Sequence, residues 1–299
     1  MIKIKIPATS ANLGPGFDTL GLALNLYNTF EFYEIKEGLE IIGCEDIHNN
    51  DNNLIYTSML KTFEKTGYYP RGIKIIIESN IPISRGLGSS AACILGGVMG
   101  ANELAGSPLS IDEVFKIATE LEGHPDNVAP ALFGGLVVSV TDDNQIYHNK
   151  IDVAPGIKFV ALIPDFTLST KSAREVLPSN IPYQDAVYNV SRVSLLISAL
   201  NNGRFDLFKV ALKDRLHQPY RGKLISGFDE IIKKCYELNC LGVYLSGAGP
   251  TIMTIINKED DDFIIGIKDY FNINNINWDI KELDLDLNGA KIEKTARGF

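Results

Sequence analysis

The sequence predicts an α+β fold built from two units, and three observations support this prediction. Strand-like and helix-like segments alternate along all 299 residues. The length suggests about two domains of ordinary size. The hydrophobic fraction of 45% is sufficient for a sizeable core and argues against disorder. Because Ala154-Pro155-Gly156 separates two α+β halves, we expect domains over residues 1–155 and 156–299.

In the first half, the alternating residues 2–6 are typical of a strand. A helix rich in alanine and glycine, suited to close packing on a sheet, is expected over residues 89–104. Ser110 and Glu113 form a capping box that opens the next helix, which is expected to run to Glu122 and end at Gly123. Further strands are expected at residues 30–35, 73–78 and 136–140, with a loop at 124–127 before a short helix.

The second half begins with an expected strand at residues 158–163. Two strands flank the tight turn Gly247-Ala248-Gly249-Pro250. The acidic run at residues 259–262 suits the first turn of a helix, where negative charge favours the helix dipole. The other expected elements are helices at 183–200, 205–216, 228–238 and 261–270, and a strand at 278–283.

Charge and composition exclude several classes of protein. The 28 basic and 37 acidic residues leave a net charge of -9, and the basic ones are scattered, so no nucleic-acid partner is expected. No apolar run approaches the roughly 18 residues of a membrane span, and the N-terminus lacks the apolar core of a signal peptide. The four cysteines form no CxxC pair, which supports neither a disulfide framework nor a zinc site. A cytoplasmic location is therefore expected.

The segment between residues 82 and 92 has the composition of an anion-binding turn. A strand leads into glycines, and the glycines lead into a helix opened by Ser89 and Ser90. Free amides at a helix N-terminus attract anions, and Gly86 and Gly88 permit positive φ and close approach of a phosphate. The spacing Gly86-x-Gly88-x-x-Ala91 also fits a dinucleotide fingerprint, so an NAD(P)-dependent oxidoreductase is an alternative. No Walker A loop occurs in the chain.

Two further segments are dense in glycine and small polar residues. Residues 7–21 contain Asn12 and Asp18, which either bind a small polar ligand or satisfy the backbone of their own loop. Residues 245–251 lie between two predicted strands, and such a glycine-rich hairpin is usually only a turn.

Together, the three segments resemble the GHMP kinase superfamily and, within it, the homoserine kinases. The resemblance rests on Pro-Ala-Thr-Ser-Ala-Asn-Leu-Gly-Pro-Gly-Phe-Asp, Pro-x-Ser-Arg-Gly-Leu-Gly-Ser-Ser, His-x-Asp-Asn-Val-Ala-Pro and Ser-Gly-Ala-Gly-Pro-Thr, in this order over essentially the full chain. It implies a ribosomal-S5-like N-terminal domain and a ferredoxin-like C-terminal domain, with the active site between them. Mevalonate-pathway kinases of the same superfamily remain an alternative, and a non-catalytic nucleotide-sensing protein is a weaker one.

The resemblance also implies a site for ATP and Mg²⁺. The triphosphate would be wrapped chiefly by backbone amides, and Ser89 or Ser90 with Glu122 would hold Mg²⁺. Glu120 is an alternative to Glu122 as the metal ligand. The implied ATP-binding residues are Pro82, Ile83, Ser84, Arg85, Gly86, Leu87, Gly88, Ser89, Ser90, Ala91 and Ala92.

For the other substrate, the resemblance implies L-homoserine, which would be converted to O-phospho-L-homoserine in threonine biosynthesis. It implies that Asn12 and Asp18 bind the amino acid, with Asp18 on the ammonium group and His124 beside them. Arg174 and Arg221 would bind the carboxylate, for which a guanidinium is well shaped, and Arg215 is an alternative to Arg221. His217 is expected to be structural, and a homodimer is what the family suggests.

The catalytic step departs from the superfamily pattern at one position. Mevalonate kinase and galactokinase use an aspartate base where this chain has Asn127, and an amide cannot accept a proton at neutral pH. We therefore expect catalysis without a dedicated base, in which Asn127 orients the hydroxyl and the γ-phosphate takes its proton. Asp126 as the base is the alternative. The expected catalytic residues are Asn127, Arg174 and His124.

Overall fold

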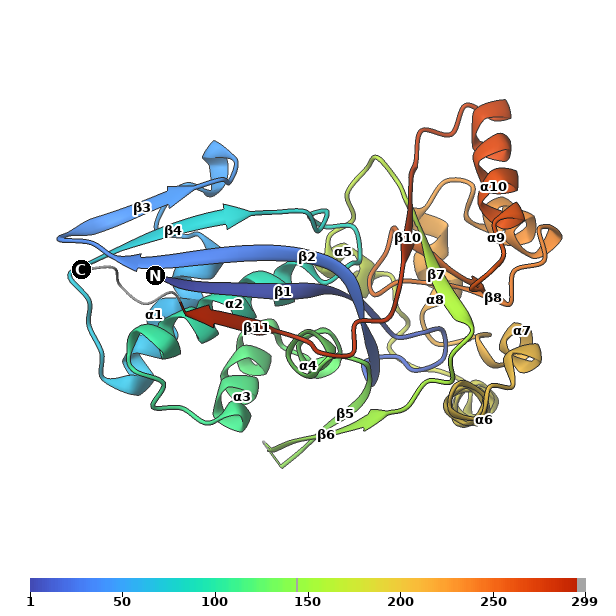
Figure 1. Ribbon diagram of the computed structural model, residues 1–299. Coiled ribbons are helices and arrows are strands. Elements are labelled where there is room, and N and C mark those ends of the chain that lie inside the picture. Colours follow the sequence, from blue (N-terminus) through green and yellow to red (C-terminus); the bar gives the residue numbers. More distant parts are fainter. Residues whose placement is uncertain (144, 295–299) are drawn as a thin grey trace.

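The computed structural model describes residues 1–143 and 145–294. The strands of this part form two sheets (Figure 1). The first has the order β11-β1-β2-β4-β3, with β5 paired to β2 and β6 to β5, and the second has the order β10-β7-β9-β8. All pairs are antiparallel except β3 with β4. The first sheet contains β1 (Ile2–Ala11), β2 (Leu20–Glu34), β3 (Gly38–Ile42), β4 (Gly72–Glu78), β5 (Leu136–Asp142), β6 (Gln145–Ile151) and β11 (Lys291–Lys294), and the second contains β7 (Ile157–Ile163), β8 (Gly242–Leu245), β9 (Ile252–Asn257) and β10 (Asp279–Leu283).

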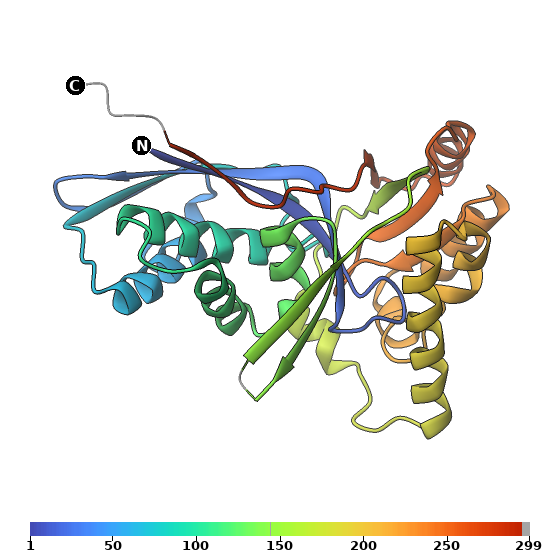
Figure 2. The same cartoon turned by 60° about the horizontal axis from the view of Figure 1, so that its bottom comes forward.

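Four helices cover one face of the first sheet (Figure 2). They are α1 (Leu54–Thr66), α2 (Ser89–Leu104), α3 (Ile111–Glu122) and α4 (Pro125–Phe133). A Cβ atom on Gly96 or Gly100 would come within 2.5 Å of the ring of Phe30 or Phe32, respectively, so α2 lies directly on β2. The small residues of α2 thus permit the close packing that the sequence predicts.

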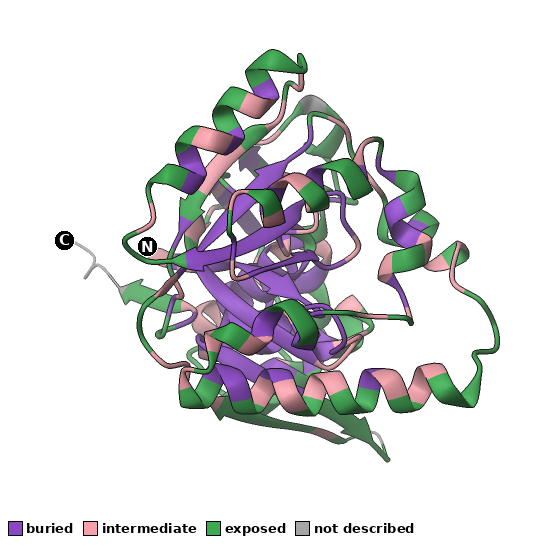
Figure 3. Ribbon diagram, turned by 90° about the vertical axis from the view of Figure 1, so that its right-hand side faces the viewer, coloured by how far each residue is buried: buried purple, intermediate pink, exposed green. Residues whose placement is uncertain are grey.

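In the second sheet, β7 is buried on both faces and supplies apolar side chains in both directions. Phe159, Ala161 and Ile163 belong to a large core that the two sheets share, whereas Val160 and Leu162 pack in a separate core beneath α9 and α10. The first sheet and its four helices are called the first unit, and the second sheet with its helices the second unit. In the second unit, the helices surround the buried strands and expose their outer sides (Figure 3). They are α5 (Thr170–Glu175), α6 (Tyr183–Asn202), α7 (Phe208–Ala211), α8 (Gln218–Arg221), α9 (Phe228–Glu237) and α10 (Asp262–Ile273).

The predicted α+β class is confirmed, and α2 and α3 have the predicted bounds, including the capping box of Ser110 with Glu113. Two local predictions are wrong. The expected loop at 124–127 is already helical, because α4 begins at Pro125, where proline is well tolerated in a first turn. The expected helix at 205–216 ends at Ala211, because the carboxylate of Asp214 accepts the amides of Leu216, His217 and Gln218 and holds them in a turn.

The division into residues 1–155 and 156–299 remains a prediction. The boundary lies near the start of β7, yet β11 returns to the first sheet and pairs with β1. Elements that the sequence analysis did not predict are β3, β6, β11, α1, α5 and α8. Within the described residues, no helix combines the length and apolarity needed to cross a membrane.

Candidate active site

The three glycine-rich segments meet in one place, between the two sheets. The Ser10 hydroxyl lies 2.7 Å from that of Ser246, and the Asn12 amide donates to the Gly247 carbonyl at 2.9 Å. The Ser246 hydroxyl also donates to the carbonyl of Gly86 at 2.6 Å. The segments border a cleft of about 840 Å³ that is lined from both units.

The glycine-rich loop joins β4 to α2, and its glycines are required by their neighbours as well as by backbone conformation. Gly86 and Gly88 have φ of +76° and +71°. A Cβ on Gly86 would lie 2.3 Å from the Ser246 carbonyl oxygen, and one on Gly88 would lie 1.9 Å from the Thr9 hydroxyl. Gly88 caps α2 without a side-chain hydrogen bond, so the first amides of α2 are left for an anion.

Eight of the eleven residues predicted to bind ATP line the cleft, and three do not. Leu87, Ala91 and Ala92 are fully buried in the large core that the two sheets share, and the Ala92 amide already donates to the Gly88 carbonyl. Their side chains therefore pack the loop and the helix in place. Those that line the cleft are Pro82, Ile83, Ser84, Arg85, Gly86, Gly88, Ser89 and Ser90.

Arg85 fastens the glycine-rich loop to the second unit. Its guanidinium donates to the carbonyls of Pro164 and Asp165, both at 2.8 Å, directly after β7. The Leu168 amide donates in turn to the Ser84 carbonyl at 3.1 Å. The position of this loop is therefore set by both sheets.

A hydroxyl and a carboxylate face each other at the start of α2. The Ser90 hydroxyl donates to Glu122 at 2.8 Å, and Ser89, Ser90 and Glu122 all line the cleft. Burial raises the pKa of Glu122, although the Ser90 hydrogen bond and the nearby His124 act in the opposite direction. Glu120 is exposed and lies outside the cleft lining, so the geometry favours Glu122 over Glu120 as a metal ligand.

The donor set fits a magnesium ion shared with phosphates. A half-buried carboxylate whose hydrogen bond comes from a neutral hydroxyl is a suitable oxygen ligand for a hard cation. Among the described residues, no group of three or more His, Cys, Asp and Glu side chains could hold a metal ion. A magnesium ion here would therefore depend on phosphate oxygens of a nucleotide for most of its ligands.

His124, Asp126 and Asn127 form a connected group where α4 begins. The Asp126 carboxylate is buried and lies 2.6 Å from His124 Nδ1 and 3.3 Å from the Asn127 amide nitrogen. The Asn127 carbonyl oxygen accepts from the Thr9 hydroxyl at 2.7 Å, which fixes the orientation of the amide. Burial opposes the charge on His124, but the hydrogen bond and charge of Asp126, together with Glu122, raise its pKa.

This raised pKa predicts a pH-dependent contribution to stability. Because the folded pKa exceeds the unfolded value, the contribution is complete below about pH 6.5 and is lost as the pH rises through the folded pKa. We expect His124→Asn, which keeps a good N-cap residue, to lower the free energy of unfolding more at about pH 6 than at about pH 9. Urea unfolding at both pH values measures the difference. His148→Asn, at an exposed histidine, is the control, and an equal loss at both pH values would contradict the prediction.

Near His124 and Asp126, the cleft carries two arginines and an aspartate. Arg174 makes a bidentate ion pair with Asp18, with N···O distances of 3.0 and 2.9 Å. Arg221 is buried and donates to the carbonyls of Ala173 and Gly247 at 3.0 and 3.1 Å. Burial and the charge of Arg174 lower the pKa of Arg221 to about 10. Both guanidiniums lie over the ring of Phe17, within 5.7 Å of its centroid.

The structure thus brings together the residues predicted for the second substrate, and it separates the alternative arginine from them. Asn12, Asp18, His124, Arg174 and Arg221 all line the cleft. Arg215 instead pairs with Asp185 at 2.8 Å, outside the cleft lining. The Asn12 amide oxygen accepts from the Asp18 backbone at 3.0 Å, so these two residues belong to one preformed loop.

Several cleft residues were not predicted. The turn at residues 247–249, expected to be structural, lines the cleft, and so do Thr167, Leu168 and Thr170 before and at the start of α5. Another part of the lining comes from residues after β3 and before α1, including Gly43, Glu45 and Asn53. Only the glycine-rich turn carried a sequence signal, because the others have ordinary compositions.

Comparison with known protein families identifies the class of protein. The model of the GHMP kinases N terminal domain matches residues 53–135, and that of the GHMP kinases C terminal domain matches residues 196–266. With the two-sheet fold and the phosphate-type loop opening α2, these matches define a GHMP kinase. The dinucleotide interpretation is wrong, because α2 leads into α3 rather than into a parallel strand beside β4.

Individual relatives narrow the class. The chain is 55% identical over 292 residues to a homoserine kinase of Clostridium botulinum and 52% identical over 293 residues to one of Clostridium beijerinckii, covering 98% of each chain. The crystal structure of homoserine kinase from Cytophaga hutchinsonii aligns with a TM-score of 0.86 at 29% identity, over 98% of this chain and 97% of that one. Mevalonate kinase of L. major shares the fold, with a TM-score of 0.72 at 16% identity over 94% of each chain. The chain belongs to the homoserine kinase family and is an ATP-dependent small-molecule kinase.

Proposed function

We propose that the protein transfers the γ-phosphate of ATP to the side-chain hydroxyl of L-homoserine, giving O-phospho-L-homoserine for threonine biosynthesis, with Mg²⁺ as cofactor. The observation that carries this proposal is that a single cleft combines two kinds of binding group. One part of the lining offers glycine-rich backbone and a helix N-terminus, and an adjoining part offers one carboxylate and two guanidiniums. Such a cleft suits a polyphosphate next to a small zwitterion.

In this proposal the ATP phosphates lie against the loop between β4 and α2. The amides near Gly86, Gly88 and the start of α2 supply partial positive charge without a lysine or a Walker A sequence. Ser90 or Ser89, with Glu122, would hold Mg²⁺. When bound, the ion would neutralise charge on the phosphates during transfer.

The amino acid would occupy the part of the cleft that carries Asp18, Arg174 and Arg221. Asp18 would pair with its ammonium group, and Arg174 and Arg221 would pair with its carboxylate. Asp18 and Arg174 pair with each other in the free protein. The bound zwitterion would replace this ion pair with two others, one between Asp18 and its ammonium group and one between Arg174 and its carboxylate. A mevalonate-type substrate has no ammonium group and would leave Asp18 uncompensated.

The proposed reaction needs no dedicated base. Asn127, fixed by Thr9, would orient the hydroxyl of homoserine toward the γ-phosphate. The new bond joins the hydroxyl oxygen to phosphorus, the bond to the β-phosphate oxygen breaks, and the hydroxyl proton passes to the transferred phosphoryl group. Arg174 and His124, the latter with its raised pKa, would place positive charge beside the reacting groups.

Asp126→Asn tests this mechanism, because it keeps the size of the side chain and removes the carboxylate, both as a proton acceptor and as the charged partner of His124. The carboxylate is occupied by His124 and Asn127, as expected for a structural partner of the orienting amide. We expect kcat to fall by no more than about tenfold, whereas loss of a general base costs about 10²- to 10⁴-fold. Because Asp126 also raises the pKa of His124, any part of the pH profile of kcat that depends on protonated His124 should move to lower pH. A loss of three decades with unchanged ATP affinity would establish Asp126 as the base.

An ATP-coupled assay across L-homoserine, mevalonate, galactose and shikimate tests the function. Turnover of L-homoserine alone is expected. Turnover of mevalonate with no turnover of homoserine would overturn the proposal.

A homodimer and a cytoplasmic location are also part of the proposal. The location is supported by four cysteines that form no disulfide in the described residues, and light scattering of the purified protein would test the dimer.

A further inference from the structure

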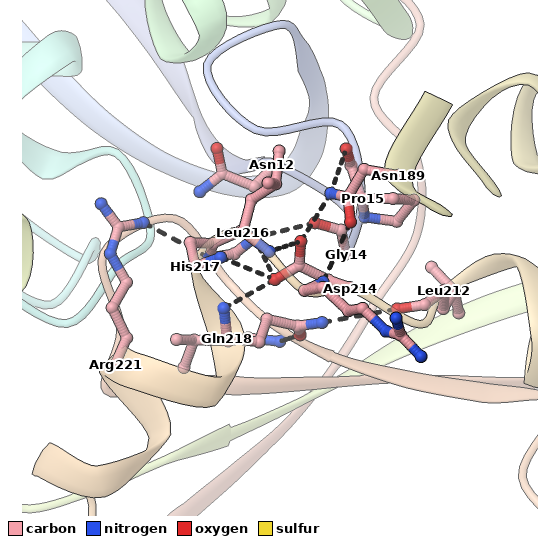
Figure 4. A network of polar contacts seen from close by, with 12 residues as sticks. Asn12, Gly14, Pro15, Asn189, Leu212, Asp214, Leu216, His217, Gln218 and Arg221 are labelled. Carbon is pink, nitrogen blue, oxygen red and sulfur yellow. Dashed lines mark hydrogen bonds and ion pairs between the residues drawn. The ribbon is translucent and has the colours of Figure 1, made fainter. Parts of the chain in front are cut away.

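A buried polar network adjoins Asn12 and Arg221, two residues of the cleft lining (Figure 4). Its centre is Asp214, between α7 and α8, whose side chain is fully buried. The carboxylate accepts the amides of Leu216, His217 and Gln218 at 2.7–2.9 Å, and the side-chain amide of Asn189 at 2.6 Å. Four donors satisfy the buried charge and fix the segment that carries His217.

His217 is fully buried and connects two parts of the proposed substrate site. Its Nε2 lies 2.8 Å from the Gly14 carbonyl oxygen, and its Nδ1 lies 3.5 Å from a guanidinium nitrogen of Arg221. Since a carbonyl can only accept, Nε2 carries the proton, and the Nδ1 lone pair faces Arg221. The imidazole ring also stacks on Phe17, with centroids 5.1 Å apart and an interplanar angle of 21°.

The loop between Asn12 and Asp18 rests on the second unit at three successive points. The Gly14 carbonyl oxygen accepts from His217 Nε2, the Pro15 carbonyl oxygen accepts from the Asn189 side-chain amide at 3.2 Å, and Phe17 stacks on the His217 ring. A Cβ on Gly14, where φ is +72°, would lie 2.4 Å from the Leu212 carbonyl oxygen, so the contact is tight. The second unit therefore supports the loop on the side away from the cleft.

We infer that His217, held by Asp214, is a positioning residue for the amino-acid substrate. Its ring does not line the cleft. It holds the Gly14 carbonyl, and with it the loop that carries Asn12 and Asp18, and it also contacts the side chain of Arg221. Three groups that would touch the zwitterion thus depend on one ring. The identity of the substrate in this inference rests on the proposed function.

The inference predicts an effect on one substrate and not on the other. His217→Phe keeps a flat ring over Phe17 but removes both hydrogen bonds. We expect the KM for homoserine to rise about tenfold, as for loss of one or two hydrogen bonds, while the KM for ATP stays within about twofold. His217→Gln retains an amide that can donate to the Gly14 carbonyl, and should recover most of the homoserine KM. His148→Phe, the same substitution at an exposed histidine, is the control.

A second variant tests the same contact from the other side. Gly14→Ala pushes the loop away from Leu212 without changing His217, and should give the same selective rise in homoserine KM. The double variant should add little to the larger single effect, because both changes release one contact. If His217→Phe does not fold, Gly14→Ala and His217→Gln carry the test.

Three outcomes are decisive. A selective rise in homoserine KM with rescue by His217→Gln supports the inference. Equal rises for both substrates, or a lower Tm with both KM values unchanged, would assign His217 a purely structural role and overturn it. Failure of the proposed function is a separate result, because the wild type would then not phosphorylate homoserine at all. In that case, the KM for ATP is compared with the KM for the alcohol that the wild type does phosphorylate.

Discussion

Substitution of Glu122 by glutamine is expected to lower kcat about 10²-fold, the scale of losing one charge-stabilising group at a reacting phosphate. The carboxylate is half-buried in the cleft and receives a hydrogen bond from Ser90 at 2.8 Å. Burial raises its pKa, so keeping it ionised there costs free energy in the absence of a cation. A bound Mg²⁺ would offset that cost. Glutamine keeps the shape and one oxygen but removes the charge.

The measurement is a titration of kcat with Mg²⁺ at saturating ATP and homoserine. Glu122→Gln should need more Mg²⁺ to reach half of its maximal rate, and high Mg²⁺ should restore part of the activity. Glu120→Gln is the matched control, because Glu120 lies on the same helix, two residues away, with an exposed side chain. Unchanged activity in Glu122→Gln, or an equal loss in Glu120→Gln, would remove Glu122 from the proposed metal site.

Features set by neighbouring residues could be predicted from the sequence. The capping box of Ser110 and Glu113 and the left-handed Gly123 fix both ends of α3 within a few residues of chain. For α1, local signals were present but unused: Asn53 accepts the amides of Ile55 and Tyr56, and Gly67 ends the helix at φ +68°.

Features set by distant residues could not be predicted. β11 and β1 lie near opposite ends of the sequence and pair with each other. No local pattern indicates that the last strand returns to the first sheet. The turn that ends α7 depends on a carboxylate that competes with the helix for backbone amides, and apolar periodicity does not reveal that competition. Local sequence therefore predicts the helices better than the edges of the sheets.

The candidate site shows the same contrast between features set by neighbouring residues and features set by distant ones. The anion-binding loop was predictable from its own glycines and serines, since a helix N-terminus needs little help from elsewhere. The pairing of Asp18 with Arg174 joins residues 156 positions apart, and only the family resemblance linked them. The contact of His217 with Gly14 spans 203 positions, and the histidine could be recognised only as structural. Residues that support a substrate loop from behind have no motif of their own.

The Asp18–Arg174 pair leads to the second large effect. We expect Asp18→Asn to lower kcat/KM for homoserine roughly 30-fold or more, since loss of a desolvated charge pair costs on the order of 2 to 5 kcal/mol. Asparagine keeps the size of the side chain but cannot neutralise an ammonium group. It also leaves Arg174 without its bidentate partner in the free protein, beside the buried Arg221. The KM for ATP should change little, because the side chain of Asp18 pairs with Arg174 and its backbone with Asn12, and neither contact is to the glycine-rich loop.

The control and the substrate analogue separate binding from folding. Asp206 pairs with Arg204 through two contacts of 2.9 and 2.8 Å on the exposed surface, so Asp206→Asn removes a similar pair outside the cleft lining and should leave kinetics unchanged. With 4-hydroxybutanoate, which lacks the ammonium group, the wild type should be much less active than with homoserine. Asp18→Asn should reduce the difference in activity between the two substrates, because the variant no longer has a carboxylate to bind the ammonium group. If instead both substrates lose activity by the same factor, Asp18 serves the loop and Arg174 rather than the ammonium group of the substrate.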